Sequence, residues 1–290
     1  MKIFVTGGSG FVGKHLVKRL QQEGHSVIVL DIIDPAIKGA EYRKADITDY
    51  SAVLKAMEGG ADVVYHLAAQ ISLPFSVQKP LKDFELNALG TLNLLEACRV
   101  LNVGKFILVS TAAIYGKPEK NPVSEDAPKR PDTPYGMSKL TAESYVRLYH
   151  RLYGMAYTIL RFFNLYGPGG KGVVPLFVNK AINKEALTLM GSGEQIRDFL
   201  YIEDALDALK MALYGLENDE FNVGFGKETT IKDVAEEVKR QTGAEITYKK
   251  QEVGDELYPI ADISKIKLEG FTPSVGLSEG IKRIIKIVGG

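Results

Sequence analysis

Cysteine occurs only once in this 290-residue sequence, and neither sign of charge is in excess. The single cysteine, Cys98, excludes an intrachain disulfide and any zinc site built from several cysteines. It lies in the apolar pattern of residues 94–98, which favours a small buried side chain over a reactive thiol. Lys plus Arg and Asp plus Glu number 36 each, so no global field attracts nucleic acid or a membrane surface.

Long apolar runs, internal repeats and low-complexity segments are lacking as well. No stretch approaches the roughly 20 apolar residues that a membrane-spanning helix needs. The first residues already read as a strand and a turn, so we expect no signal peptide and a cytoplasmic location. A composition with 45% hydrophobic and 25% charged residues is ordinary for a globular protein with a sizeable core.

Glycine is concentrated in a turn near the start of the chain. Residues 2–5 predict a strand, the turn holds Gly7, Gly10 and Gly13, and a helical apolar pattern follows. Glycines at this spacing allow a tight turn and a close approach of the backbone to a pyrophosphate. The start of the helix offers N–H groups and a partial positive charge to the phosphates. The spacing alone also fits a plain strand–helix turn.

Asp31 makes a dinucleotide site the better interpretation of this turn. A second apolar run, residues 26–30, ends at Asp31. An acidic residue at about this distance after the glycines meets the adenosine ribose in dinucleotide-binding domains. The first part of the chain is therefore predicted to bind a dinucleotide.

Strand-like and helix-like runs alternate through the first half of the chain. Residues 62–67, 105–109 and 156–161 read as buried parallel strands. This alternation predicts an α/β fold with a doubly wound parallel sheet of the Rossmann type. A loop signal at residues 167–170 predicts a domain boundary.

Two domains are therefore expected. The first is a dinucleotide-binding Rossmann domain over residues 1–166, and the second is a smaller α/β lobe over residues 167–290. Segments around residues 203–225 are expected to return to the first domain.

Tyr135 and Lys139 are the main candidates for chemistry. Four residues apart on a helix, they share a face, so the ammonium can lie beside the phenol. A nearby cation lowers the pKa of a phenol and permits acid–base work near neutral pH. With 14 tyrosines, about one such pair arises by chance, so its place after a turn-rich segment gives it weight. Ser110 and Thr111 follow a strand, where hydroxyls bind a substrate oxygen or simply cap the chain.

These motifs together resemble the extended short-chain dehydrogenases/reductases that act on nucleotide sugars, the NAD-dependent epimerase/dehydratase family. The resemblance covers nearly the whole chain. The matching segments are residues 6–13, 31, 46–47, 66–69, 87–95, 110–116, 135–139, 161–168, 193–199 and 261–262. Each segment alone is weak evidence for the family, but all of them occur in the family's order and at its spacing.

The resemblance implies a role for each matching residue. Tyr135 would be the catalytic acid–base, Lys139 would lower its pKa and hold the nicotinamide ribose, and Thr111 would bind the reacting sugar hydroxyl. NAD would contact Gly7, Gly10, Phe11, Val12, Gly13, Asp31, Asp46, Ile47, Leu67, Ala68, Ala69, Asn87, Ser110, Tyr135, Lys139 and Phe162. The substrate would contact Thr111, Tyr135, Asn164, Val174, Arg197 and Asp255.

Charge bears on two of these residues. The carboxylate of Asp31 repels the additional phosphate of NADP, so NAD is expected as the cofactor. The guanidinium of Arg197 suits phosphate oxygens, and its alternative is an ion pair with Asp198 or another acid. No metal is expected.

The residues after Thr111 narrow the reaction within the family. Dehydratases carry Asp-Glu there and decarboxylases tend to carry a Glu, whereas Ala112 and Ala113 cannot transfer protons. The resemblance is therefore strongest to UDP-glucose 4-epimerases and implies epimerisation of a UDP-hexose at C4 through a transient 4-keto sugar. The alternatives are a 4-keto sugar-nucleotide reductase, an epimerase of UDP-N-acetylhexosamine, and a non-catalytic NAD-binding protein.

Two positions depart from the family pattern. Glu252 stands where many epimerases have an arginine that grips the diphosphate, and Lys249 and Lys250 are candidates to replace it. Pro259 stands where a bulky tyrosine would close the site to an N-acetyl group, which keeps an N-acetylhexosamine substrate open.

Two helices are candidates for contacts between subunits. Residues 89–99 and 138–153 carry apolar and aromatic side chains at helical spacing. Family members commonly pair these helices across a dimer as a four-helix bundle, so a homodimer is expected. Burial beneath the rest of the chain is the alternative.

Overall fold

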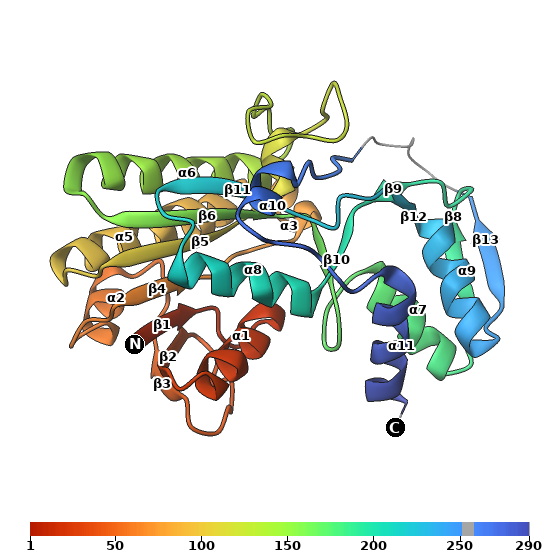
Figure 1. The fold of residues 1–290 in the computed structure, drawn as a ribbon, viewed down its shortest axis with the longest axis horizontal. Helices are drawn as coiled ribbons and strands as arrows, with labels where there is room; N and C mark the ends of the chain where they lie inside the picture. The colour runs from red at the N-terminus through yellow and green to blue at the C-terminus, as the bar shows by residue number, and fades with distance from the viewer. Residues whose placement is uncertain (251–257, 290) are drawn as a thin grey trace. The chain divides into compact units, whose positions relative to one another are not determined.

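A seven-stranded β-sheet is the centre of the fold, in the order β11–β6–β5–β4–β1–β2–β3 (Figure 1). The computed structural model describes residues 1–250 and 258–289. The strands are β1 (Lys2–Thr6), β2 (Ser26–Asp31), β3 (Glu41–Lys44), β4 (Val63–His66), β5 (Lys105–Thr111), β6 (Ala156–Phe162) and β11 (Asp219–Val223). The pairs from β3 through β5 are parallel. The predicted α/β class with a doubly wound Rossmann sheet is confirmed.

Helices cover both faces of this sheet. Helices α5 (Gly90–Val100) and α6 (Pro134–Tyr153) lie together on one face, and α1 (Phe11–Gln22) lies on the other (Figure 1). The central strands are apolar on both sides because both sides are covered, as residues 27–30 of β2 show by being buried throughout.

Short helical elements complete the connections around the sheet. They are α2 (Tyr50–Ala56), α3 (Leu73–Gln78), α4 (Pro80–Phe84), the π-helical turn η1 (Glu85–Leu89) and the 3-10 turn η2 (Ala112–Tyr115). Helix α8 (Ile202–Tyr214) returns to the sheet, where the hydroxyl of Tyr65 in β4 donates to the carbonyl of Leu209 at 2.8 Å.

The chain divides into two compact units. The first consists of Met1–Gly116, Pro128–Arg161 and Ala208–Phe221. The second consists of Lys117–Ala127, Phe162–Asp207 and the chain from Asn222 onward. Three segments depart from a simple division at residue 166, because 117–127 and 162–166 belong to the second unit and 208–221 belongs to the first.

The second unit contains small sheets and several helices. Its strand pairs are β7–β10, β9–β12 and β8–β13. The elements are β7 (Asn164–Tyr166), α7 (Val173–Ile182), β8 (Leu187–Met190), β9 (Ile196–Arg197), β10 (Phe199–Tyr201), β12 (Thr229–Thr230), α9 (Ile231–Thr242), β13 (Ile246–Lys249), α10 (Ser264–Leu268) and α11 (Leu277–Val288). No helix within residues 1–250 and 258–289 is long and apolar enough to cross a membrane.

A buried ion pair joins β6 to α6. Arg161 and Glu143 are both fully buried, and they meet through Nη2–Oε2 at 2.8 Å and Nε–Oε1 at 3.0 Å. Arg161 also donates to the hydroxyl of Tyr115 at 3.0 Å and approaches Glu220 at 3.1 Å. Removing one member of such a pair leaves a buried charge without its partner, which is strongly destabilising.

We therefore expect Arg161→Met to lower the free energy of unfolding by about 3 kcal/mol. The loss falls at the lower end of the range for buried pairs because Arg147 still reaches Glu143 at 3.2 Å. Urea unfolding followed by circular dichroism measures it. Arg283→Met is the matched control, because the ion pairs of Arg283 lie on the surface. Equal losses in the two variants would contradict the importance of burial.

Candidate active site

The turn between β1 and α1 has space for backbone only. Gly7 has φ +70°, and a Cβ built on it would lie 2.5 Å from the backbone nitrogen of Ala68. A Cβ on Gly13 would overlap the carbonyl oxygen of Gly7. Glycine is therefore required at both positions, and the turn brings bare backbone to the carboxyl end of the sheet.

The start of α1 suits an anion. In the part of the chain that the structure describes, no side chain caps Gly10 and the first turn of α1 holds no acidic residue. The N–H groups at this helix end and their partial positive charge thus suit a phosphate. Phe11 and Val12, predicted to contact the cofactor, form this first turn and are half-buried.

Asp31 lies where a ribose is expected, at the end of β2. Its carboxylate accepts hydrogen bonds from the backbone of Ser9 at 3.0 Å and of Ile33 at 3.1 Å. The bond from Ser9 ties Asp31 to the glycine turn. The bare turn, the uncapped helix start and this carboxylate together fit a dinucleotide.

The remaining cofactor candidates of the first unit follow strands. Leu67, Ala68 and Ala69 come directly after β4 and are half-buried. Asp46 accepts two hydrogen bonds from Thr48, at 2.9 Å and 2.8 Å. Ile47 is buried, and no Cβ would fit between it and Gly90.

Thr111 and Tyr135 meet at the end of β5. Thr111 is the last residue of that strand, and its side chain forms a hydrogen bond with the Tyr135 side chain. Tyr135 stands in the first turn of α6, which begins after Thr133, whose hydroxyl accepts from the backbone of Gly136 at 3.1 Å. The structure thus brings together a phenol and an alcohol that the sequence separates by 24 positions.

Burial dominates the titration of Tyr135. It raises the pKa of Tyr135 to about 12, and the negative charge of Asp83 acts in the same direction. The hydrogen bond with Thr111 acts in the opposite direction, because it stabilises the phenolate.

The sequence predicts that Lys139 lowers the pKa of Tyr135, but burial raises that pKa in the folded chain. The ammonium of Lys139 is directed toward β5, where it donates to the carbonyl of Val109 at 2.8 Å. Lys139 itself is 2% exposed, and burial lowers its pKa to about 8. The charges of Glu143 and Asp83 act in the opposite direction and favour the ammonium.

Asn87 and Ser110, both predicted to contact the cofactor, form hydrogen bonds with protein groups. The amide of Asn87 is buried and binds the backbone of Gln70 on both sides, accepting at 2.8 Å and donating at 3.0 Å. The buried hydroxyl of Ser110 donates to Glu143 at 2.6 Å. The two side chains therefore hold the loop after β4 and the end of β5 in place.

His66 belongs to the same buried set, although the sequence assigned it no role. Its Nδ1 lies 2.8 Å from the hydroxyl of Thr6 and its Nε2 lies 2.9 Å from that of Thr91. Thr91 donates to the carbonyl of Asn87 at 2.6 Å, so its oxygen can accept from Nε2–H. Burial and the charge of Lys139 keep the pKa of His66 well below its usual value.

The predicted substrate residues of the second unit have mixed outcomes. The side-chain amide of Asn164 donates to the carbonyl of Asp198 at 3.3 Å. The guanidinium of Arg197 lies 3.1 Å from the ring centroid of Tyr258. The carboxylate of Asp198, the alternative ion-pair partner named for Arg197, accepts hydrogen bonds from three backbone N–H groups. Burial raises the pKa of that carboxyl, against the effect of these bonds.

Three further positions complete this set. Val174, predicted to contact the substrate, is fully buried at the start of α7. Phe162, at the end of β6, is 4% exposed. Asp255 and Glu252 lie outside the described residues, and Lys249 and Lys250 are exposed.

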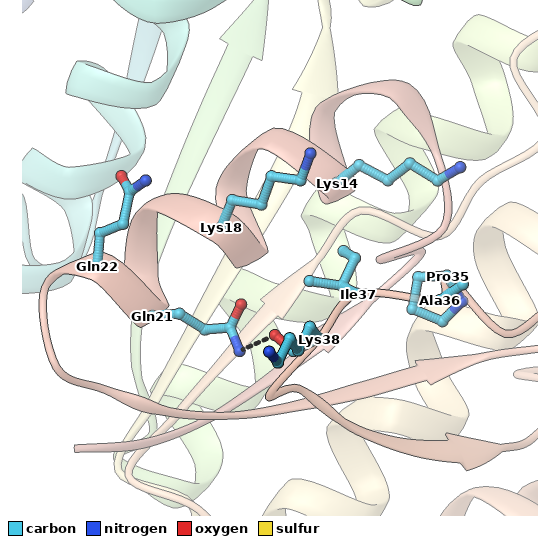
Figure 2. Close-up of a pocket in the computed structure, with 8 residues that line it drawn as sticks. All are labelled: Lys14, Lys18, Gln21, Gln22, Pro35, Ala36, Ile37 and Lys38. Carbon is cyan, nitrogen blue, oxygen red and sulfur yellow. Dashed lines mark hydrogen bonds between the residues drawn. The ribbon is translucent and has the colours of Figure 1, made fainter.

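A pocket of the first unit lies apart from these residues. It is formed by the outer side of α1 and residues 35–38, where Gln21 donates to the carbonyl of Lys38 at 3.2 Å (Figure 2). Lys14 and Lys18 point along its rim. Neither Thr111 nor Tyr135 lines it. Within the described part of the chain, no group of three or more His, Cys, Asp and Glu side chains could hold a metal ion.

Comparison with known proteins gives one family and several similar proteins. The profile of the NAD dependent epimerase/dehydratase family matches residues 3–224. The chain is 33% identical over 306 residues to UDP-glucose 4-epimerase of Mycolicibacterium smegmatis, covering 99% of this chain and 98% of that protein.

Two solved structures are similar over nearly the whole chain. One is the UDP-glucose 4-epimerase of Thermotoga maritima with UDP-glucose, with a TM-score of 0.95, 36% identity, and coverage of 99% of this chain and 98% of that one. The other is the UDP-glucose 4-epimerase of Thermus thermophilus in complex with NAD, with a TM-score of 0.92, 36% identity and the same coverages of 99% and 98%.

The depressed pKa of Lys139 predicts a pH-dependent stability. In the folded chain its ammonium loses a proton near pH 8, whereas the usual pKa is 10.5. Between these values the unfolded chain binds more protons, so the free energy of unfolding rises with pH. The rise amounts to about 3 kcal/mol.

Chemical unfolding at pH 7 to 10.5 measures this rise, with Lys139→Met as the reference that lacks the titrating group. The difference between the wild type and Lys139→Met should change in favour of the wild type as the pH increases. Parallel pH dependences in the two proteins would show that Lys139 titrates normally.

Proposed function

Because the chain belongs to the NAD-dependent epimerase/dehydratase family, we propose that it epimerises a UDP-hexose at C4 with NAD as its cofactor. The reaction interconverts UDP-glucose and UDP-galactose through a transient 4-keto sugar, in agreement with the activity named for its relatives. We place the reaction in the cytoplasm, the location expected from the sequence.

The hydrogen bond between Thr111 and Tyr135 carries this proposal, together with the two alanines that follow Thr111 in the sequence. Epimerisation at one carbon needs one group that takes a proton from the sugar hydroxyl and returns it. Loss of water or of carbon dioxide needs additional proton-transferring groups. Ala112 and Ala113 supply none, so the residues after Thr111 suit epimerisation.

The protein's own part in the reaction is binding and proton transfer. Tyr135 is the proton-transferring group. Its phenolate, the minor form while burial holds the pKa of Tyr135 near 12, accepts the proton of the C4 hydroxyl, and the phenol donates a proton back when the C4 oxygen becomes a hydroxyl again. Thr111 stabilises that phenolate by its hydrogen bond and orients the sugar hydroxyl. NAD, when bound, supplies the hydride acceptor and donor at C4.

The glycine turn and Asp31 are assigned to the cofactor. The first turn of α1 binds the diphosphate, because its N–H groups lack a side-chain cap in the described chain. Asp31 binds the adenosine ribose and disfavours NADP by charge. Lys139 holds the nicotinamide ribose, for which its ammonium must leave the carbonyl of Val109 or share its protons with it.

A UDP-N-acetylhexosamine is the second candidate substrate. Pro259 is buried and presents a compact ring at the position where a bulky tyrosine closes related sites. The two substrates differ at C2, where the N-acetyl group needs more space than a hydroxyl, so the free volume beside C2 decides between them.

A homodimer belongs to the same proposal. Apolar and aromatic side chains on or next to the predicted pairing helices α5 and α6 are exposed in the single chain, including Leu89, Val100, Leu152 and Tyr153. By contrast, Tyr149 is 8% exposed, and its hydroxyl donates to Glu96 of α5 at 3.0 Å, so it serves contacts within the chain. Exposed apolar side chains on these helices favour pairing with a second copy.

Tyr135→Phe tests the mechanism. It removes the proton-transferring oxygen and leaves the ring, so kcat should fall by roughly 10²–10⁴-fold while bound NAD is retained. Turnover is measured with UDP-glucose, UDP-galactose and their N-acetyl counterparts, and NAD by absorbance after acid extraction. Tyr145→Phe, on the same helix, is the control and should keep full activity. Full activity in Tyr135→Phe would overturn the mechanism.

Leu152→Glu tests the dimer. Leu152 is 59% exposed on α6, and a carboxylate there would be buried without a partner in the paired helices, which is unfavourable. Sedimentation velocity should show a shift from dimer to monomer. Leu268→Glu, at a position that is 89% exposed in the second unit, should leave the sedimentation coefficient unchanged. A monomeric wild type would refute the proposal.

A further inference from the structure

Asp83 is a fully buried carboxylate outside the set of residues that sequence motifs identify. Its Oδ2 accepts a hydrogen bond from the hydroxyl of Ser138 at 2.6 Å. Its Oδ1 accepts from the amides of Gln70 at 2.7 Å and Asn87 at 3.2 Å. All three donors are neutral side chains, so they solvate the carboxylate without cancelling its charge.

These donors come from three separate segments. Gln70 belongs to the loop after β4, Asn87 to η1, and Ser138 to α6. Ser138 lies between Tyr135 and Lys139 in sequence and is itself 2% exposed. Asp83 therefore joins the helix that carries both residues to the loop that follows β4.

The charge of Asp83 acts on Lys139. Glu143 also acts on this lysine, but its carboxylate is bound by Arg161 through two hydrogen bonds and by Arg147 at 3.2 Å. Glu143 has the larger effect of the two carboxylates on Lys139, but two cations lie beside it and oppose its field. Asp83 has no such partner among its hydrogen-bond donors, so its negative charge is the less compensated one.

The other groups that face Lys139 are neutral near pH 7. The carbonyl of Val109 accepts from its ammonium, and His66 is kept neutral by burial and by Lys139. Tyr135 is neutral as well, because burial raises its pKa. The buried ammonium thus depends on the two carboxylates, of which Asp83 is the one without an arginine.

We propose that Asp83 is a positioning residue, which anchors the first turns of α6 through Ser138 and is, beside Glu143, a buried counter-charge of the Lys139 ammonium. The proposal rests on the proposed function, which gives Tyr135 and Lys139 their roles. If Asp83 only accepted hydrogen bonds, an amide could replace it without changing the titration of Lys139. If Asp83 is a counter-charge, the same replacement changes that titration.

Asp83→Asn separates these two possibilities, since it keeps an oxygen for Ser138 and removes the charge. The alkaline limb of the kcat–pH profile should move to lower pH by about one unit, because Lys139 then loses its proton more readily. Ser138→Ala keeps the charge and removes the anchor, so it should lower kcat without moving the limb. Asp83→Glu should restore the wild-type position. An unmoved limb in Asp83→Asn overturns the counter-charge.

The same titration is measured without turnover by chemical unfolding. The alkaline rise in unfolding free energy should begin about one pH unit lower in Asp83→Asn than in the wild type and Ser138→Ala. A shifted rise in a protein that converts no UDP-sugar would refute the proposed function and leave the counter-charge intact. An unshifted rise in a protein that epimerises normally would refute the counter-charge and leave the proposed function intact.

A second variant serves if Asp83→Asn does not fold. Asp83→Ser removes the same charge with a smaller side chain, so the alkaline rise in unfolding free energy should again begin at lower pH than in the wild type. An unshifted rise in Asp83→Ser would overturn the action of Asp83 on Lys139.

Discussion

The burial of charged side chains around α6 is the constraint on which the rest of the candidate site depends. Lys139, Glu143 and Asp83 are all nearly or fully buried on or beside this helix. A buried charge is tolerated only when it is paired or fully hydrogen-bonded. Glu143 meets that demand through Arg161 of β6, and Asp83 meets it through neutral donors. The same contacts that make these charges tolerable also hold α6 against the sheet.

Sheet topology brings the functional segments together. Strand β1 lies between β2 and β4, and β4 lies between β1 and β5, so the loops after these strands meet at one edge. The absence of a side chain on Gly7 allows its backbone to approach Ala68. His66 extends this contact inward by bonding to Thr6 and Thr91. A nucleotide fold of this kind therefore needs small residues at the turn and satisfied polar residues beneath it.

Much of the fold and of the candidate site could be predicted from local patterns, and the rest could not for physical reasons. Val174 matches a family position, but its burial depends on how α7 packs, which no local pattern expresses. The pKa of Tyr135 depends on desolvation, which helical spacing cannot express, so proximity to Lys139 in sequence was a poor guide. Asp83 has no local signal, because an acid within a short helix is usually a solvated side chain. Only its three distant donors distinguish it.

The sequence by itself determined the doubly wound sheet, the glycine turn, the family, and the identity of NAD and a UDP-sugar as the molecules to consider. These depend on periodicity and on motif residues that stand close together along the chain. Only the tertiary structure decided which polar groups are buried, which partners they have, and in which direction their pKa values move. Those properties depend on contacts between segments far apart in sequence, such as Asp83 with Ser138 and Glu143 with Arg161. Desolvation and charge pairing are properties of the folded arrangement, and no local pattern encodes them.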